Sequence, residues 1–71
     1  MNFEQLNFTT FCVGSLADAL KISAGKVYTL LRTSGILTNY LLPGYEVLHT
    51  FSKEYIVEDL IECMKEKGVL I

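Results

Sequence analysis

The chain has 71 residues, of which 51% are hydrophobic and 20% charged, and its formal net charge is −2. Its length predicts one domain over residues 1–71, with a core too thin to hold every apolar side chain. The composition is too apolar for a disordered segment, and no apolar run reaches the roughly 18 residues that a membrane-spanning helix needs. We therefore expect the surplus apolar side chains to line an interface with another protein or with a second copy of the chain.

The first residues, Met1-Asn2-Phe3-Glu4, lack the basic start of a secretion signal, so we expect a cytoplasmic protein without a membrane partner. Cys12 and Cys63 lie far apart among apolar neighbours, a pattern of neither a disulfide framework nor a metal site. We interpret both as reduced core thiols. A bridge between them stays open as the alternative if the outer helices pack together.

Apolar residues recur at helical spacing through the first twenty positions. Gly14 interrupts this stretch, and Ser15 followed by Asp18 resembles a capped helix start. The pattern predicts a helix over about residues 3–13 and a second, or a continuation of the first, over about 15–21. The inward residues of this region are Phe3, Leu6, Phe11, Val13, Leu16, Ala17 and Leu20.

Ser23 and Gly35 are typical of a helix cap and a helix end, which predicts a further helix between them, to about Ser34. Its inward residues are Val27, Leu30 and Leu31. The segment from Ile36 to Phe51 carries one charge and a proline-glycine turn, Leu42-Pro43-Gly44-Tyr45. Its periodicity fits short helical turns as well as the two arms of a small hairpin around Pro43-Gly44.

The last helix is the most clearly marked. Ser52 or Thr50 caps it, Gly68 predicts a left-handed stop, and Val69 should fold back onto Met64. One apolar stripe runs along it, formed by Ile56, Val57, Leu60, Ile61 and Met64. The whole pattern predicts an all-α fold, a small bundle of three to four helices.

The segment from Ser15 to Leu31 resembles a helix-turn-helix unit, in which Ala17 permits a close crossing and Ile22 fills the turn. It departs from that family at Lys21, where glycine is most common. The outward residues Lys26, Thr29 and Arg32 are the candidates for DNA contacts. Two cations on this helix of an acidic chain are a poor electrostatic footprint, so the pattern indicates a steeply crossed helix pair more strongly than a DNA site.

Glutamates recur every four residues along the last helix, at positions 54, 58, 62 and 66. Such a row is usually a solvated face, and a docking strip for a basic partner is the more specific interpretation. Together with the neutral 36–51 segment, it supplies the candidate protein-binding residues. These are Tyr40, Leu41, Tyr45, Leu48, Glu54, Glu58 and Glu62.

No residues form a catalytic, metal-binding or cofactor-binding pattern. His49 is the only histidine, and Cys12 has no base nearby in the sequence. Gly25-Lys26-Val27 lacks the other residues of a phosphate-binding loop. We therefore expect a protein that is not an enzyme and that uses no cofactor, metal or small-molecule ligand.

Three segments carry a family resemblance: Leu16 to Leu31, Tyr45-Glu46-Val47-Leu48-His49-Thr50 with the following Lys53 to Ile61, and Met64-Lys65-Glu66-Lys67-Gly68. Together they resemble a small bacterial family, the domain of unknown function 3791. The resemblance covers nearly the whole chain and implies a stand-alone intracellular domain encoded beside a toxin-type, ADP-ribosyltransferase-related protein. It carries over no functional residue, and we expect His49 and Tyr55 to pack the linker onto the last helix.

These features predict a non-catalytic protein-binding accessory domain, either an antitoxin-like partner of a toxin-type protein or a homo-oligomer. A helix-turn-helix DNA-binding regulator and a structural homodimer are the alternatives.

Overall fold

The first helix, α1 (Phe3–Leu20), begins at a capping box that the sequence reading did not identify. In the computed structural model, which describes residues 1–70, the Gln5 N–H donates to Asn2 Oδ1 at 2.7 Å and the Asn2 N–H donates to Gln5 Oε1 at 3.1 Å. This exchange satisfies two backbone donors that a helix start otherwise leaves free. α1 then continues through Gly14, so the helix start at Ser15 is wrong and the alternative of one continuous helix is confirmed. Ser15 lies buried on the inner face, where packing on both sides of Gly14 outweighs the roughly 1 kcal/mol that a glycine costs a helix.

A tight turn joins α1 to α2 (Ala24–Thr33). Lys21 adopts the left-handed conformation, with φ 61°, and the Ile22 N–H donates to the Ala17 carbonyl at 3.3 Å. The Ser23 hydroxyl caps α2 by accepting from the Lys26 N–H at 3.1 Å. Gly35, at φ 85°, follows the end of the helix. The helix predicted between Ser23 and Ser34 is thus confirmed.

The segment between α2 and the last helix is helical, and residues 1–70 contain no strand, so the hairpin alternative around Pro43-Gly44 is wrong. A π-helical turn, η1 (Leu37–Leu41), is closed by the Leu42 N–H donating to the Leu37 carbonyl at 3.0 Å. The short helix α3 (Tyr45–Leu48) follows. Helical backbone is favoured because it brings Leu37, Leu41 and Leu48 to the core together, whereas an extended strand turns alternate side chains outward.

The last helix, α4 (Lys53–Glu66), has the ends that the sequence predicts. Ser52, and not Thr50, is its cap, accepting from the Tyr55 N–H at 3.2 Å. Past its end, Gly68 adopts φ 75° and donates to the Lys65 carbonyl, while the Val69 N–H donates to the Met64 carbonyl, each at 3.0 Å. This is the paired hydrogen bonding of a Schellman ending.

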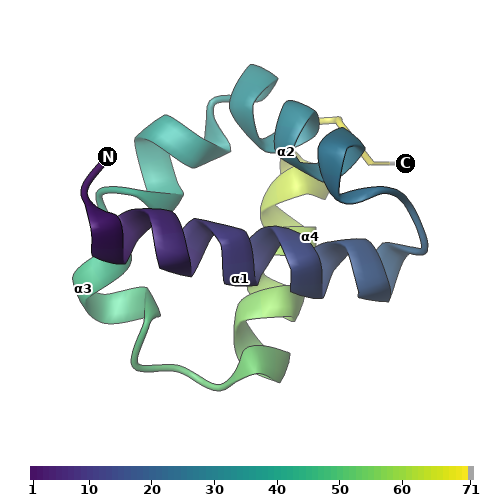
Figure 1. The fold of residues 1–71 in the computed structure, drawn as a ribbon. Coiled ribbons are helices and arrows are strands. Elements are labelled where there is room, and N and C mark those ends of the chain that lie inside the picture. The colour runs from purple at the N-terminus through teal and green to yellow at the C-terminus, as the bar shows by residue number, and fades with distance from the viewer. Residues whose placement is uncertain (71) are drawn as a thin grey trace.

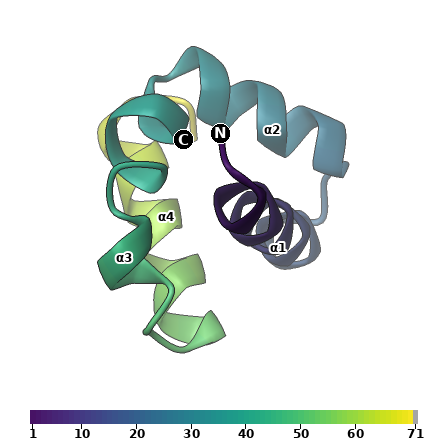
Figure 2. The same cartoon turned by 60° about the vertical axis from the view of Figure 1, so that its left-hand side comes forward.

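Three main helices, α1, α2 and α4, enclose the core, with η1 and α3 closing one end (Figure 1). Figure 2 looks nearly along α1, with α2 running across above it and α4 standing to its left. α1 therefore crosses both partners, and the predicted all-α bundle is confirmed. The buried apolar residues are Phe8, Cys12, Val13, Leu16, Val27, Leu31, Ile36, Leu37, Leu41, Leu48, Ile56, Leu60 and Met64.

None of the helices within residues 1–70 has the length and apolar character to cross a membrane. α1 is the longest of them, with 18 residues.

Candidate protein-binding surfaces

Two of the predicted protein-binding residues belong to the core. Leu41 and Leu48 are buried among the side chains that close the end of the bundle. Neither offers surface to a partner, so their assignment to a binding site is wrong. Residues 36–51 are nearly uncharged because this segment packs into the core. Its helices are too short and irregular for a periodic pattern in the sequence to show this.

Tyr40 and Tyr45 are half-buried and hold the linker in place. The Tyr40 hydroxyl, on η1, donates to the Asp59 carboxylate on α4. This hydrogen bond, with burial adding to it, raises the pKa of Tyr40 above its ordinary range, because the donated proton is needed for the bond. The Tyr45 ring meets the Phe8 ring edge-on at a centroid distance of 5.4 Å, which joins α3 to α1.

His49 and Tyr55 enter two separate aromatic pairs. The His49 ring stacks on the Tyr45 ring with a centroid distance of 4.5 Å, and His49 Nδ1 lies 2.7 Å from the Tyr45 carbonyl oxygen. The Tyr55 ring packs against the Phe51 ring with a centroid distance of 4.6 Å. Tyr55 therefore packs a linker side chain onto α4 as expected, whereas His49 stays within the region of α3.

The exposed side of α4 carries the predicted glutamates, with Glu54, Glu58 and Glu62 all accessible. A shallow groove of about 310 Å³ lies on this side, between Glu58, Glu62, Tyr55 and Asp59. At the start of the helix the paired rings remain accessible, Phe51 by 40% and Tyr55 by 50%. Large aromatic surface thus lies at the head of an acidic row.

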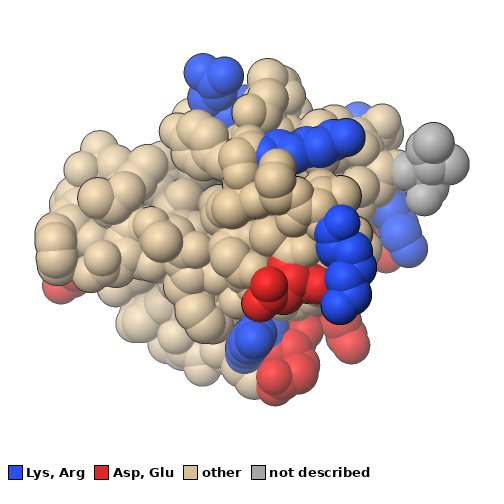
Figure 3. All heavy atoms as spheres, turned by 45° about the vertical axis from the view of Figure 1, so that its right-hand side comes forward, with Lys and Arg blue, Asp and Glu red and all other residues tan. Residues whose placement is uncertain are grey.

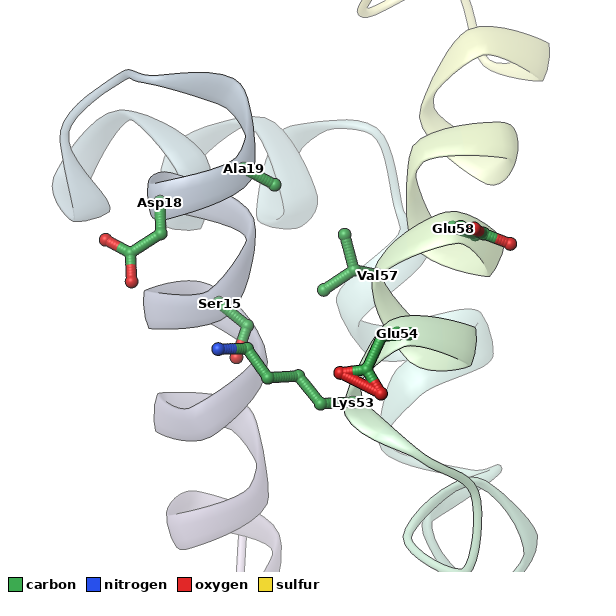
Figure 4. Close-up of a pocket in the computed structure, with 7 residues that line it drawn as sticks. All are labelled: Ser15, Asp18, Ala19, Lys53, Glu54, Val57 and Glu58. Atoms are coloured by element: carbon green, nitrogen blue, oxygen red, sulfur yellow. The ribbon is translucent and has the colours of Figure 1, made fainter.

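A second groove, of about 360 Å³, runs between α1 and α4 (Figure 4). Lys53 extends from the start of α4 toward Ser15 of α1, and Val57 points into the space between the helices. Glu58 lines this groove as well as the first one. The lysine makes this side of α4 mixed in charge, so the acidic surface lies on the side of Tyr55 and Glu62.

On α2, the candidate DNA contacts Lys26, Thr29 and Arg32 are all exposed. The Thr29 hydroxyl donates to the Gly25 carbonyl at 3.0 Å, so its proton is used within the helix. Lys21 occupies the turn in the left-handed conformation that glycine favours, although it is the position where the sequence departs from the helix-turn-helix pattern.

An accessible apolar surface lies on α1, formed by residues that the sequence pattern placed on the inward face. Phe3 is 75% exposed and Leu6 51%, and Phe11 also faces outward. An apolar groove of about 390 Å³ lies beside them between α1 and α2, lined by residues that include Leu6, Gly14 and Tyr28. The sequence contains a sign of this exposed surface. α1 carries apolar side chains around its whole circumference, whereas a helix needs only one apolar face to contribute to a core.

Charged side chains gather toward one side of the view in Figure 3, and a broad part of the same face carries almost none. The uneven distribution follows from the sequence, since Glu4 is the only charged residue before Asp18. An uncharged region and a charged region therefore lie side by side on the surface of this small domain.

The cysteines are both free. Burial raises the pKa of the Cys12 thiol to about 12 and also raises the pKa of the half-buried Cys63. Thiols of this kind are weak nucleophiles, because the reactive thiolate is scarce near neutral pH. Within residues 1–70, no group of three or more His, Cys, Asp or Glu side chains could hold a metal ion.

Comparison with known proteins leaves one match. No curated protein and no solved structure matches the chain. The family model described as "Protein of unknown function (DUF3791)" matches residues 7–67, from the second turn of α1 to the residue after α4. The resemblance seen in the sequence is confirmed, and the chain belongs to this family of proteins of unknown function.

Proposed function

We propose that this protein is a non-catalytic binding domain that docks on a basic surface of another protein through the exposed side of α4. One observation carries the proposal: the accessible Phe51–Tyr55 ring pair stands at the head of the row formed by Glu54, Glu58 and Glu62. Aromatic anchors framed by charged side chains are the usual anatomy of a protein-binding hot spot.

The energetics of α4 support a role for the row outside the fold. Like charges four residues apart destabilise a helix by about 0.2–0.5 kcal/mol per pair. A basic partner places opposite charges beside the row, which offsets this repulsion and speeds the encounter of the two proteins. Burial of one large apolar side chain contributes about 1.5–3 kcal/mol, so Phe51 and Tyr55 supply affinity while the glutamates supply orientation.

The family resemblance implies an antitoxin-like role beside a toxin-type protein, so a toxin-type product of the adjacent gene is the first partner to examine. In that role the domain binds its neighbour and itself performs no chemistry. The weakly nucleophilic thiols and the stacked His49 are consistent with a protein of this kind.

Co-expression of the tagged chain with the neighbouring gene product tests the proposal. We expect the two to co-purify, the complex to weaken as salt rises, and Glu58→Lys to reduce recovery of the partner at least tenfold. Glu46→Lys is the matched control, because Glu46 is also exposed but lies on α3. A chain that elutes without the partner, whether as a monomer or as a homodimer, or a complex that Glu58→Lys leaves unchanged, contradicts the proposal.

A DNA-binding regulator is the second candidate. It is favoured because Lys26, Thr29 and Arg32 are all exposed on α2. A gel shift on the chain's own promoter at low and moderate salt tests it. Binding that falls with salt and is lost in a Lys26→Ala/Arg32→Ala variant supports this function. No shift at low salt excludes it.

A further inference from the structure

The outer face of α1 combines large and small residues in an order that suits a copy of itself. Phe3, Asn7, Thr10 and Gly14 follow one another at spacings of four, three and four residues, which places them along one line of the helix. The bulky end of this line is Phe3, which is mostly exposed. The opposite end is Gly14, where an added Cβ would meet nothing within 4 Å.

We infer that this face is the two-fold contact of a homodimer, in which α1 packs antiparallel against α1 of a second copy. With the axis between residues 8 and 9, Phe3 of each copy lies over Gly14 of the other. Asn7 lies opposite Thr10, so the two polar residues of the line meet each other. A two-fold contact forms every such pair twice, which lets one chain supply both the protruding and the receiving surface.

The groove between α1 and α2 fits this arrangement. It borders Gly14 and is lined by Leu6, Val13 and Tyr28, so it is apolar and open to the incoming helix. In the antiparallel register, Phe3 and Leu6 of one copy approach the groove at the Gly14 end of the other. The hollow is thereby filled by side chains that the isolated chain leaves in contact with water.

Charge distinguishes this face as the one suited to a second copy. No charged residue lies on the line from Phe3 to Gly14 or lines the groove. Glu4 lies on the flank of the line, and Asp18 lies beyond the overlap of the two helices. The acidic side of α4, in contrast, would repel its own copy, because like charges meet themselves across a two-fold contact.

The available area is sufficient for a specific dimer. Phe3 is 75%, Phe11 44% and Tyr28 40% exposed. Since an aromatic side chain buries about 150–250 Å², these three rings alone offer about 300 Å² per copy. Met1, 61% exposed, and Leu6, 51% exposed, add to this area, which brings a contact over the whole face to about the lower bound of the 1,200–2,000 Å² in total that specific interfaces bury.

Sedimentation equilibrium of the full chain across a wide concentration range tests the inference. We expect a mass of twice the 8.0 kDa chain at high concentration. Gly14→Leu should raise the dissociation constant at least tenfold, because the leucine occupies the space that receives Phe3. It should leave the monomer fold intact, since a Cβ at this position meets no atom within 4 Å, the groove beside it is open and the helix gains propensity.

Gly25→Leu is the matched control, because Gly25 is also an exposed helical glycine with open space around it. Circular dichroism and urea unfolding of both variants separate loss of the dimer from loss of the fold. A wild-type chain that stays monomeric, or a dimer that Gly14→Leu leaves intact, overturns the inference. So does a monomer that uses this face for a different protein, which would lose that protein in Gly14→Leu.

A cross-link tests the register. Mixing a Phe3→Cys chain with a Gly14→Cys chain, both carrying Cys63→Ser, should give a covalent dimer on mild oxidation, because Cys12 is buried. Failure to cross-link contradicts the proposed antiparallel overlap. None of these outcomes depends on the α4 surface, so this inference and the proposed function stand or fall separately.

Discussion

Gly44 lies between η1 and α3, where the surrounding atoms leave no space for a side chain. A Cβ at this position would lie 2.7 Å from the Tyr40 carbonyl oxygen and 3.1 Å from Leu48 Cδ1. The nearer atom is backbone, so the linker must shift to admit even a methyl group. We expect Gly44→Ala to lower the free energy of unfolding by about 1–3 kcal/mol, the usual cost of overpacking.

Urea unfolding followed by circular dichroism checks this expectation. Gly25→Ala serves as the control, because its added Cβ meets no atom within 4 Å and alanine favours a helix by up to about 1 kcal/mol. Equal stability of the two variants would show that the close approach at Gly44 is absent in solution.

Tyr40 makes the chain sensitive to alkaline pH. Its pKa is raised in the folded state, so above its ordinary pKa of about 10 the unfolded chain releases this proton first. The contribution of the Tyr40–Asp59 hydrogen bond is therefore complete below pH of about 10 and falls as the pH rises further. We expect Tyr40→Phe to cost about 1 kcal/mol at neutral pH, because the bond is only partly buried, and less at high pH.

The measurement is urea unfolding of wild type and Tyr40→Phe at a series of pH values from 7 upward. Burial of Cys12 contributes to alkaline instability in both chains, so the difference between them isolates the tyrosine. A difference that stays constant across this range would contradict the assigned hydrogen bond.

Local chemistry was readable from the sequence where one residue type has one strong preference. Ser23 and Gly68 are examples, since a hydroxyl before a helix and a glycine after it satisfy free backbone groups. The Tyr40–Asp59 bond was not readable, because it joins two elements whose relative placement depends on the irregular turn η1. Leu41 and Leu48 show the converse, since apolar residues without a clear period give no sign of whether they face inward.

Among the elements, α4 allows a direct test of which residue caps its N-terminus. The sequence offers Thr50 and Ser52 as caps, and in the structure only Ser52 accepts from a backbone N–H of the helix. The Thr50 hydroxyl instead donates to the Val47 carbonyl. We expect Ser52→Ala to lower stability by about 1 kcal/mol, the usual cost of a lost cap, and Thr50→Ala to cost less. Thermal unfolding of the two variants decides, and the opposite order would place the start of α4 at Thr50.

The turn between α1 and α2 stores a small strain at Lys21. A left-handed conformation costs a residue with a side chain about 1–2 kcal/mol relative to glycine. Lys21→Gly should therefore stabilise the chain by about 0.5–1 kcal/mol, after allowing for the greater freedom of glycine in the unfolded state. An unfolding curve shifted to lower urea would argue against the positive φ at this position.

Element boundaries were least predictable where the sequence contains conflicting signals. Gly14 and Ser15 together resemble the junction of two helices, yet α1 runs through them because residues on both sides pack into one core. The hairpin alternative failed for a related reason. A turn-forming Pro43-Gly44 pair is compatible with a helical reversal as well as with a strand reversal, and only the burial of Leu37, Leu41 and Leu48 decides between them.

For the whole molecule, composition predicted more than motifs did. A small chain with half of its residues apolar must leave apolar surface exposed, and the fold places this surface on the outer side of α1 and at the head of α4. The sequence reading placed the interface in residues 36–51 because that segment is nearly uncharged. The acidic row on α4 lies where its four-residue period predicts, on one exposed side.

The most direct test of the proposed function is the affinity of the purified chain for the toxin-type protein that the family resemblance implies as its partner, measured by titration calorimetry at two salt concentrations. We predict saturable binding that weakens with salt, at least tenfold weaker binding for Glu58→Lys, and unchanged binding for Glu46→Lys. An affinity that is insensitive to salt and equal in all three chains would show that the acidic side of α4 is not the binding surface.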